Sequence, residues 1–245
     1  MDLEAIMTQT YDLDIRFTNN GMVMHIHPVL IKSGEELILV DCGNPGVAPL
    51  IKEAISKLGY NPKDLTKIVI THHDHDHFGS LAELKREFPN LVVISSEIEK
   101  DYIEGQLKSL RLVQAESIYD TLPEERKEWA RGFHKYLSEI EPVTVDRTVK
   151  EGEAIDQLGE VVAILTPGHM PGHMSVYLPT EKRLISGDAL VSEEGVLFMA
   201  NPQYSLDLEV ARRSAIKLSE LEISEVICYH GGSVKGDVSA LLRKL

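Results

Sequence analysis

The chain has 245 residues, of which 43% are apolar, and its 39 acidic against 25 basic side chains give a formal net charge of −14. This length fits one large domain or two small ones, and the apolar content can fill a sizeable core. Such an acidic chain would repel a phosphate backbone, so a nucleic-acid partner is not expected. No stretch approaches the roughly 18 uninterrupted apolar residues of a membrane span, and the N-terminus lacks a signal-peptide pattern, so we expect a cytoplasmic protein without a membrane partner.

The first half of the chain predicts strands followed by strand–helix alternation. Strands are expected at about 11–17, 22–31, 37–41, 66–71 and 91–95, with helices at about 46–58 and 79–88. The first three strands are expected to form an antiparallel meander. The two cysteines, Cys42 and Cys228, exclude a disulfide framework and a four-cysteine zinc site.

Charged, helix-favouring sequence from about 98 to 141 interrupts this alternation and predicts a helical insertion, divided by Pro123 and closed by Pro142. The insertion is expected to pack on the body, with a lid over the substrate as the alternative. Further elements are expected as strands at 143–149, 160–166, 174–178 and 183–187, a helix at 206–220, a strand at 224–228 and a helix at 234–244. We expect two sheets covered by helices within a single domain, 1–245.

Titratable side chains concentrate at the ends of predicted strands. The stretch KIVITHHDHDHFGS, residues 67–80, places four histidines and two aspartates within six positions. TPGHMPGH and ICYHGG place His169, His173 and His230 after other strands, and LISGDAL does the same for Asp188. Strand ends are where a rigid scaffold holds functional groups, and imidazole and carboxylate ligate zinc, iron or manganese. The pattern therefore predicts a metal site.

One ion would leave several of these groups idle, whereas two ions would use them. The expected ligands are His72, Asp74, Asp76, His77, His169, Asp188 and His230. Two ions can activate a bridging water at neutral pH, which is the chemistry of a hydrolase. His73 and His75 are expected to support the ligands or to face solvent.

Five motifs, LILVDCG, ITHHDHDHFG, TPGHMPGH, LISGDAL and ICYHGG, occur in this order along nearly the whole chain. Together they resemble the metallo-β-lactamase superfamily, in the branch around glyoxalase II and the acyl-homoserine lactonases. The resemblance implies an α/β fold, a four-layer αββα sandwich, with a dinuclear site at the edge where its two sheets meet.

The resemblance also implies roles for single residues. The ligands would be His72 and His169 for the first metal, Asp76, His77 and His230 for the second, and Asp188 as a bridge between them. His173 matches a histidine that supports the site without binding metal. Asp41 matches the acid of the DxG strand end, which has a structural role near the metal loop.

Asp74 departs from the usual first motif of the family, His-x-His-x-Asp-His, because it stands where the second histidine is expected. Flavodiiron proteins, a redox branch, also carry an acid there, although theirs is glutamate and accompanies a flavin domain without counterpart in these 245 residues. An added carboxylate should weaken the Lewis acidity of the first metal and shift its preference from zinc towards iron or manganese.

The sequence thus predicts a dinuclear metal-dependent hydrolase that attacks an ester, thioester or lactone of a small substrate through a metal-bridging hydroxide. Asp76 is the expected proton acceptor. The expected cofactors are two divalent ions, zinc by the resemblance, with iron or manganese as alternatives. A di-iron, oxygen-using oxidoreductase is the alternative function, and a binding protein without turnover is a third. The oligomeric state stays open, with a homodimer as one option.

Overall fold

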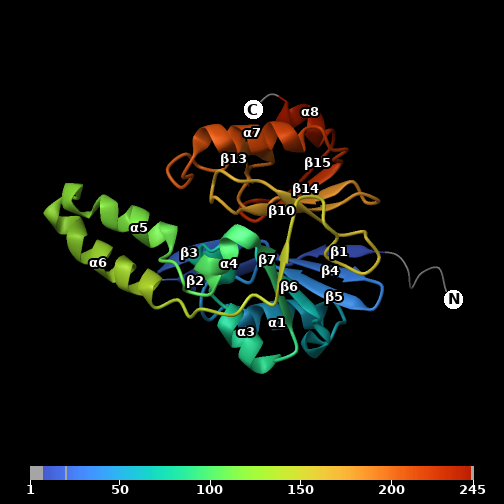
Figure 1. The fold of residues 1–245 in the computed structure, drawn as a ribbon, viewed down its shortest axis with the longest axis horizontal. Helices are drawn as coiled ribbons and strands as arrows, with labels where there is room; N and C mark the ends of the chain where they lie inside the picture. The colour runs from blue at the N-terminus through green and yellow to red at the C-terminus, as the bar shows by residue number, and fades with distance from the viewer. Residues whose placement is uncertain (1–7, 20, 244–245) are drawn as a thin grey trace.

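The computed structural model describes residues 8–19 and 21–243, and two β-sheets form its body (Figure 1). The six-stranded sheet has the order β1 (Gln9–Asp12), β4 (Val29–Ser33), β5 (Glu36–Val40), β6 (Lys67–Val69), β7 (Val92–Ser96) and β8 (Arg147–Val149). The five-stranded sheet has the order β15 (Gly232–Lys235), β14 (Glu225–Cys228), β11 (Arg183–Ile185), β10 (Met174–Leu178) and β9 (Val162–Leu165). Strands β5 to β8 run parallel, as do β11 and β14.

Helices cover the outer face of each sheet. The six-stranded sheet is covered by α1 (Ala48–Lys57) and α3 (Leu81–Glu87), and the five-stranded sheet by α7 (Leu208–Leu218) and α8 (Val238–Leu242) (Figure 1). Successive side chains of a strand point to opposite faces. In β5, accordingly, Leu39 belongs to the apolar cluster that includes Ile51 of α1, whereas Ile38 shares a cluster with Val176 of the other sheet. The four-layer αββα sandwich expected from the sequence is confirmed.

The predicted helical insertion corresponds to α4 (Glu97–Ile103), α5 (Leu110–Ser117) and α6 (Glu124–Ser138). Helices α5 and α6 lie side by side and extend from one side of the sandwich (Figure 1). Single 3₁₀ turns lie before β6 (Pro62–Asp64) and between α5 and α6 (Tyr119–Thr121). No helix within residues 8–19 and 21–243 has the length and apolarity that crossing a bilayer requires.

The strands predicted at 11–17 and 22–31 are each divided in two. Strands β2 (Ile15–Asn19) and β3 (Met22–Ile26) pair only with each other, whereas β1 and β4 pair in the six-stranded sheet. Pro28 separates β3 from β4, and a proline has no N–H to donate to a sheet ladder. The predicted meander is therefore interrupted. The β2–β3 hairpin lies between β1 and β4 in the sequence, but it does not pair with the six-stranded sheet.

Other boundaries also differ from the prediction. Residues 234 and 235, which were expected to begin a helix, instead end β15. Val234 is buried between exposed neighbours and pairs with Val226 of β14. A hairpin of β12 (Leu190–Glu193) and β13 (Val196–Met199) was not predicted. Its two turn residues, Glu194 and Gly195, both have positive φ, as a tight hairpin turn requires. The strand expected at 143–149 is paired only over β8.

Candidate metal centre

The loops after four strands meet at one edge of the sandwich. The loop after β6 leads into the short helix α2 (His75–Phe78), and the other loops follow β9, β11 and β14. A backbone hydrogen bond of 3.1 Å from Met174 N to Thr71 O joins the two sheets there. The seven residues predicted as ligands gather at this edge in three overlapping sets, each with its ligand atoms within 4.8 Å of one another: His72, Asp74 and His169; His72, His77 and Asp188; and Asp76, His77 and His230.

We call His72, Asp74 and His169 the first group. Its three residues are buried. Asp74 Oδ2 lies 3.0 Å from His169 Nε2 and 3.4 Å from His72 Nε2. One carboxylate oxygen and two imidazole nitrogens thus face a common point.

We call Asp76, His77 and His230 the second group, and it is more open to solvent. His230 Nε2 lies 3.3 Å from Asp76 Oδ2, and these two side chains are 33% and 18% exposed. His77 is fully buried behind them. Access from solvent therefore leads to the second group.

Asp188 lies between the two groups. Its Oδ1 is 3.3 Å from His77 Nε2 and 3.6 Å from His230 Nε2, whereas its Oδ2 is 3.5 Å from His169 Nε2. Each oxygen faces a different group, which is the arrangement that a carboxylate bridging two ions needs.

The donor atoms fit metal ions, because several of them are buried without a hydrogen-bond partner. His72 Nε2, His77 Nε2 and Asp188 Oδ1 are in this state among the described residues. A buried polar atom without a partner costs free energy, and native structures contain few of them. Coordination of a cation would satisfy all three atoms.

Asp41 fixes the orientation of His77. Its carboxylate accepts hydrogen bonds from Thr71 N (2.9 Å) and Thr71 Oγ1 (2.8 Å), and Oδ2 lies 2.8 Å from His77 Nδ1. A hydrogen on Nδ1 directed at this carboxylate leaves Nε2 free to ligate, which is how outer carboxylates support metal-binding histidines. Asp41 has a φ of 59°, in the left-handed region.

His173 supports Asp188 in a different way. The backbone N–H of Asp188 donates to His173 Nε2 at 2.9 Å, and His173 Nδ1 lies 2.9 Å from Thr166 Oγ1. Both ring nitrogens are thereby engaged outside the ligand groups, as a supporting role requires.

His73 and His75 turn away from the three sets of ligand atoms. The ring of His73 stacks on Tyr102 and its Nδ1 contacts the buried carboxylate of Glu99. His75 presents its ring to Phe133 and Tyr136 of α6 in edge-to-face geometry. Both histidines thus connect the metal loop to the insertion.

The charges of the centre are strongly coupled. Burial alone would lower the pKa of His77, but the carboxylates of Asp188 and Asp41, one on each side of its ring, raise that pKa well above its usual value. Burial likewise opposes ionisation of Asp188, yet His77 and His230 hold its pKa well below the usual range. The centre therefore stabilises ionised carboxylates and attracts positive charge between them.

Arg111 of α5 is a member of the site that the sequence did not predict. Its Nε lies 3.1 Å from Asp74 Oδ1 and its Nη2 lies 2.5 Å from Asp74 Oδ2. Burial opposes ionisation of Asp74, but the charge of Arg111 and the neighbouring imidazoles of His169 and His72 hold the pKa of Asp74 well below its usual range. The two partners are 37 positions apart, and no local pattern shows which face of α5 meets the metal loop.

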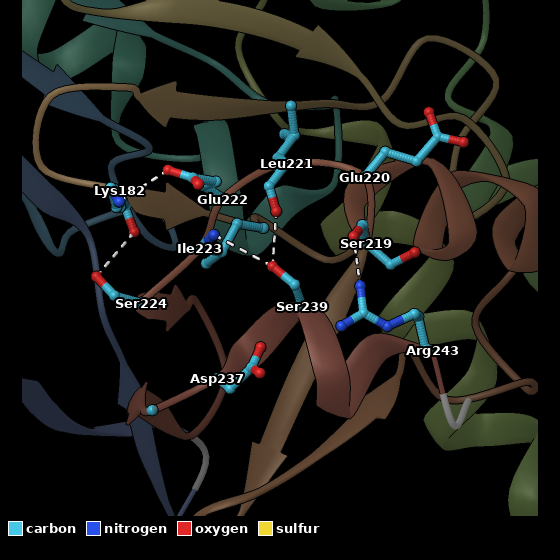
Figure 2. Close-up of a pocket in the computed structure, with 11 residues that line it drawn as sticks. Lys182, Ser219, Glu220, Leu221, Glu222, Ile223, Ser224, Asp237, Ser239 and Arg243 are labelled. Carbon is cyan, nitrogen blue, oxygen red and sulfur yellow. Dashed lines mark hydrogen bonds and ion pairs between the residues drawn. The ribbon is translucent and has the colours of Figure 1, made fainter.

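A hollow elsewhere does not belong to this centre. A pocket with a volume of about 400 Å³ lies between residues 219–224 and α8, and none of the predicted ligands lines it. Figure 2 shows the side chains that line this pocket. Its polar groups bind one another: Lys182 Nζ lies 2.7 Å from Glu222 Oε2, Ser239 Oγ donates to Leu221 O, and Arg243 donates to Ser219 O. The hollow reflects how α8 packs.

Comparisons with known proteins agree with this geometry. A family model described as the metallo-beta-lactamase superfamily matches residues 23–230. The chain is 29% identical over 217 residues to the probable metallo-hydrolase YflN of Bacillus subtilis (strain 168), covering 81% of this chain and 76% of that protein. It is 34% identical over 161 residues to the hydroxyacylglutathione hydrolase of Bartonella quintana (strain Toulouse), covering 65% of this chain and 48% of that enzyme. The crystal structure of the metallo-beta-lactamase family protein TTHA1429 from Thermus thermophilus has a TM-score of 0.73 at 22% identity, covering 96% of this chain and 77% of that one.

The chain therefore belongs to the metallo-beta-lactamase superfamily. Within it, the chain is a metal-dependent hydrolase, in agreement with its metallo-hydrolase and hydroxyacylglutathione hydrolase relatives. Several relatives are matched over less than two thirds of their own length, and the Bartonella enzyme over about half. The structural likeness to TTHA1429 concerns the fold alone.

Proposed function

We propose that the protein is a dinuclear hydrolase that cleaves an ester, thioester or lactone bond in a small substrate. The first group would hold one ion and the second group the other, with Asp188 shared between them. Ions held there would activate a water and polarise the substrate carbonyl. The observation that carries this proposal is the convergence of three buried, unpartnered ligand atoms, on His72, His77 and Asp188, at the joint edge of two sheets.

The chain's own residues supply orientation and a proton acceptor. Asp76 begins the second group, and its backbone carbonyl accepts a hydrogen bond of 2.5 Å from Tyr229 Oη, which holds the first turn of α2 in place. Its partly exposed carboxylate lies on the open side of the centre beside His230. Asp76 is therefore placed to receive the proton released when water attacks a carbonyl.

A second cavity lies on the side of the metal loop that carries His73 and His75, and none of the seven predicted ligands lines it. It has a volume of about 420 Å³ and is bounded by His75, by α4 and by the end of α6. Its walls combine apolar side chains, such as Phe78 and Leu107, with polar ones, such as His75 and Lys108. The name hydroxyacylglutathione hydrolase, borne by the Bartonella relative, makes glutathione thioesters the first substrates to try.

The oxidoreductase alternative was motivated by the carboxylate of Asp74. In the structure, the guanidinium of Arg111 pairs with that carboxylate. The extra negative charge that would favour a di-iron centre is therefore offset within the protein. Hydrolysis is the function that the geometry supports best.

Metal analysis combined with a substrate panel tests the proposal. The protein would be purified without added metal, its metal content measured, and aliquots reloaded separately with zinc, manganese or iron. We expect about two ions per chain and turnover of at least one ester, S-acylglutathione or lactone, with Asp188→Asn as the inactive control. A fully metallated protein that hydrolyses none of these classes would contradict the proposal, and oxygen consumption by the iron form would support the oxidoreductase instead.

A further inference from the structure

Arg111 brings a buried positive charge into contact with the first group. It pairs side-on with Asp74, with two parallel N–H to oxygen contacts of 3.1 and 2.5 Å. Its Nη2 also lies 3.3 Å from His169 Nε2, and the residue is only 6% exposed. The guanidinium thus touches two of the three members of the first group.

Both terminal nitrogens of Arg111 also make hydrogen bonds to other protein groups. Nη1 donates to Gln114 Oε1 at 2.6 Å, and Nη2 donates to the backbone carbonyl of Tyr204 at 3.0 Å. The ring of Tyr204 lies 5.6 Å from the guanidinium carbon, within the range of a cation–π contact. An arginine that recognises a substrate anion would direct donors towards the opening of the site. These donors are directed at Asp74 and its surroundings instead.

The start of α5 is fixed on the metal loop, so the position of Arg111 is built into the fold. Leu110 N donates to His73 Nε2 at 3.2 Å, and His73 Nδ1 contacts Glu99. Glu99 also accepts hydrogen bonds of 2.9 Å from His73 N and from Gly172 N, in the loop between β9 and β10. The two ligand-bearing loops and the insertion are therefore joined through one buried carboxylate.

The charges explain what this arrangement achieves. Asp74, Asp76 and Asp188 bring three negative charges to the centre, and Arg111 brings one positive charge. The net charge of these side chains equals that of a centre with a neutral histidine at position 74 and no arginine. We propose that the insertion supplies Arg111 as the charge-balancing partner of Asp74, so that the pair replaces the neutral imidazole of the usual family motif.

This inference rests on the proposed function, because it treats Asp74 as a metal ligand. It differs from the expectation from the sequence that Asp74 weakens the Lewis acidity of the first metal, since here the added negative charge is compensated by Arg111. It also makes a single Asp74→His exchange unfavourable. That variant would leave a buried, unbalanced cation beside the first ion, and two like charges at short range repel in a site screened from water.

A double-mutant cycle tests the coupling between Asp74 and Arg111. Zinc affinity and stoichiometry would be measured by competition with a chromophoric chelator for the wild type, Asp74→His, Arg111→Met and the double variant. Asp74→Asn, alone and with Arg111→Met, provides a second cycle in case the histidine does not fit. Arg131→Met is the matched control, because Arg131 is an exposed arginine of the same insertion that contacts Tyr119. Thermal unfolding of each metal-free variant establishes that it folds.

We expect Asp74→His to weaken zinc binding to the first group by about tenfold or more, and Arg111→Met to restore at least most of that loss in the double variant. Arg131→Met should leave zinc affinity unchanged. The inference would be overturned if Asp74→His reduced zinc affinity equally with and without Arg111→Met, and if Asp74→Asn did the same. That result would leave the metal centre itself intact. A wild-type protein that binds no zinc, manganese or iron would instead overturn the proposed function and the inference with it.

Discussion

The two ligand groups of the centre differ in what balances their charge. In the first group, the carboxylate of Asp74 is paired with a guanidinium from an insertion, and all its members are buried. In the second group, His77 lies between the carboxylates of Asp41 and Asp188, and the group opens to solvent at His230. The family scaffold itself thus supports the second group, whereas the first depends on a segment outside the sandwich.

On the proposal that Asp74 ligates the first ion, this difference indicates how a ligand position can change without loss of the site. A carboxylate in place of an imidazole adds charge and shortens the side chain's reach, and either change alone would disturb a dinuclear centre. A buried arginine that pairs with the carboxylate corrects the charge and fixes its orientation. The change at position 74 and the helical insertion are therefore best understood as one structural unit.

Replacing Asp188 should have the largest effect, because both groups share it. Asp188→Ala removes the oxygens that face His77 and His169, so we expect loss of both ions and of all turnover, while the metal-free chain still folds. Metal content, activity and thermal unfolding would be compared with Asp64→Ala, an exposed aspartate in the turn before β6. Full metal occupancy and activity in the Asp188 variant would show that neither group needs a shared ligand.

Asp41→Asn should weaken metal binding mainly at the second group and so distinguish it from the first. Asparagine tolerates the left-handed backbone at this position, so the fold should persist. Its amide cannot accept hydrogen bonds on both sides, so His77 loses the partner that keeps Nε2 free. We expect about a 100-fold loss of affinity for the second ion, with the first ion retained.

Chelator competition followed by elemental analysis measures this loss. Equal loss of both ions from Asp41→Asn would mean that the two groups bind metal as one cooperative unit. In that case the two groups would not bind their ions independently.

His173→Ala should have a smaller effect that reaches both groups. The ring accepts a hydrogen bond from the backbone of Asp188 and touches no ligand oxygen, so its loss loosens the bridging residue without removing it. We expect metal affinity or turnover to fall by about tenfold, the lower end for an outer contact. Titration of the variant with zinc checks this, and complete loss of both ions would instead identify His173 as a direct ligand.

The smallest expected effect is a difference in the rate of metal release. The second group is partly exposed, whereas the members of the first group are buried and Arg111 contacts Asp74, so excess chelator should remove the second ion first. Zinc release followed by absorbance should show two phases in the wild type. A single phase would indicate that solvent reaches both groups equally.

Several features of the fold and the site could be predicted from local sequence. The strand runs before residues 72, 166, 186 and 229 identify where imidazole and carboxylate leave the sheets, and a six-position motif carries most of the ligands. The hairpin of β12 and β13 turns at Glu194–Gly195, which is not one of the usual Asn-Gly or Asp-Gly turn pairs, and its strands are short. The predicted strands at 11–17 and 22–31 are each divided, because β1 pairs with β4 in the six-stranded sheet whereas β2 pairs with β3. Local sequence does not show which strands will pair.

The sequence by itself determined the fold class and the set of residues that gather at the sheet edge, because periodicity and strand-end motifs are local properties of the chain. Only the tertiary structure decided what surrounds Asp74. The pairing with Arg111 joins positions 37 residues apart and depends on how α5 packs against the metal loop through His73. Hydrophobic patterning predicts that a helix packs against the body of the protein. It does not predict which polar side chain of that helix reaches a buried carboxylate, because this depends on how the packed elements are placed.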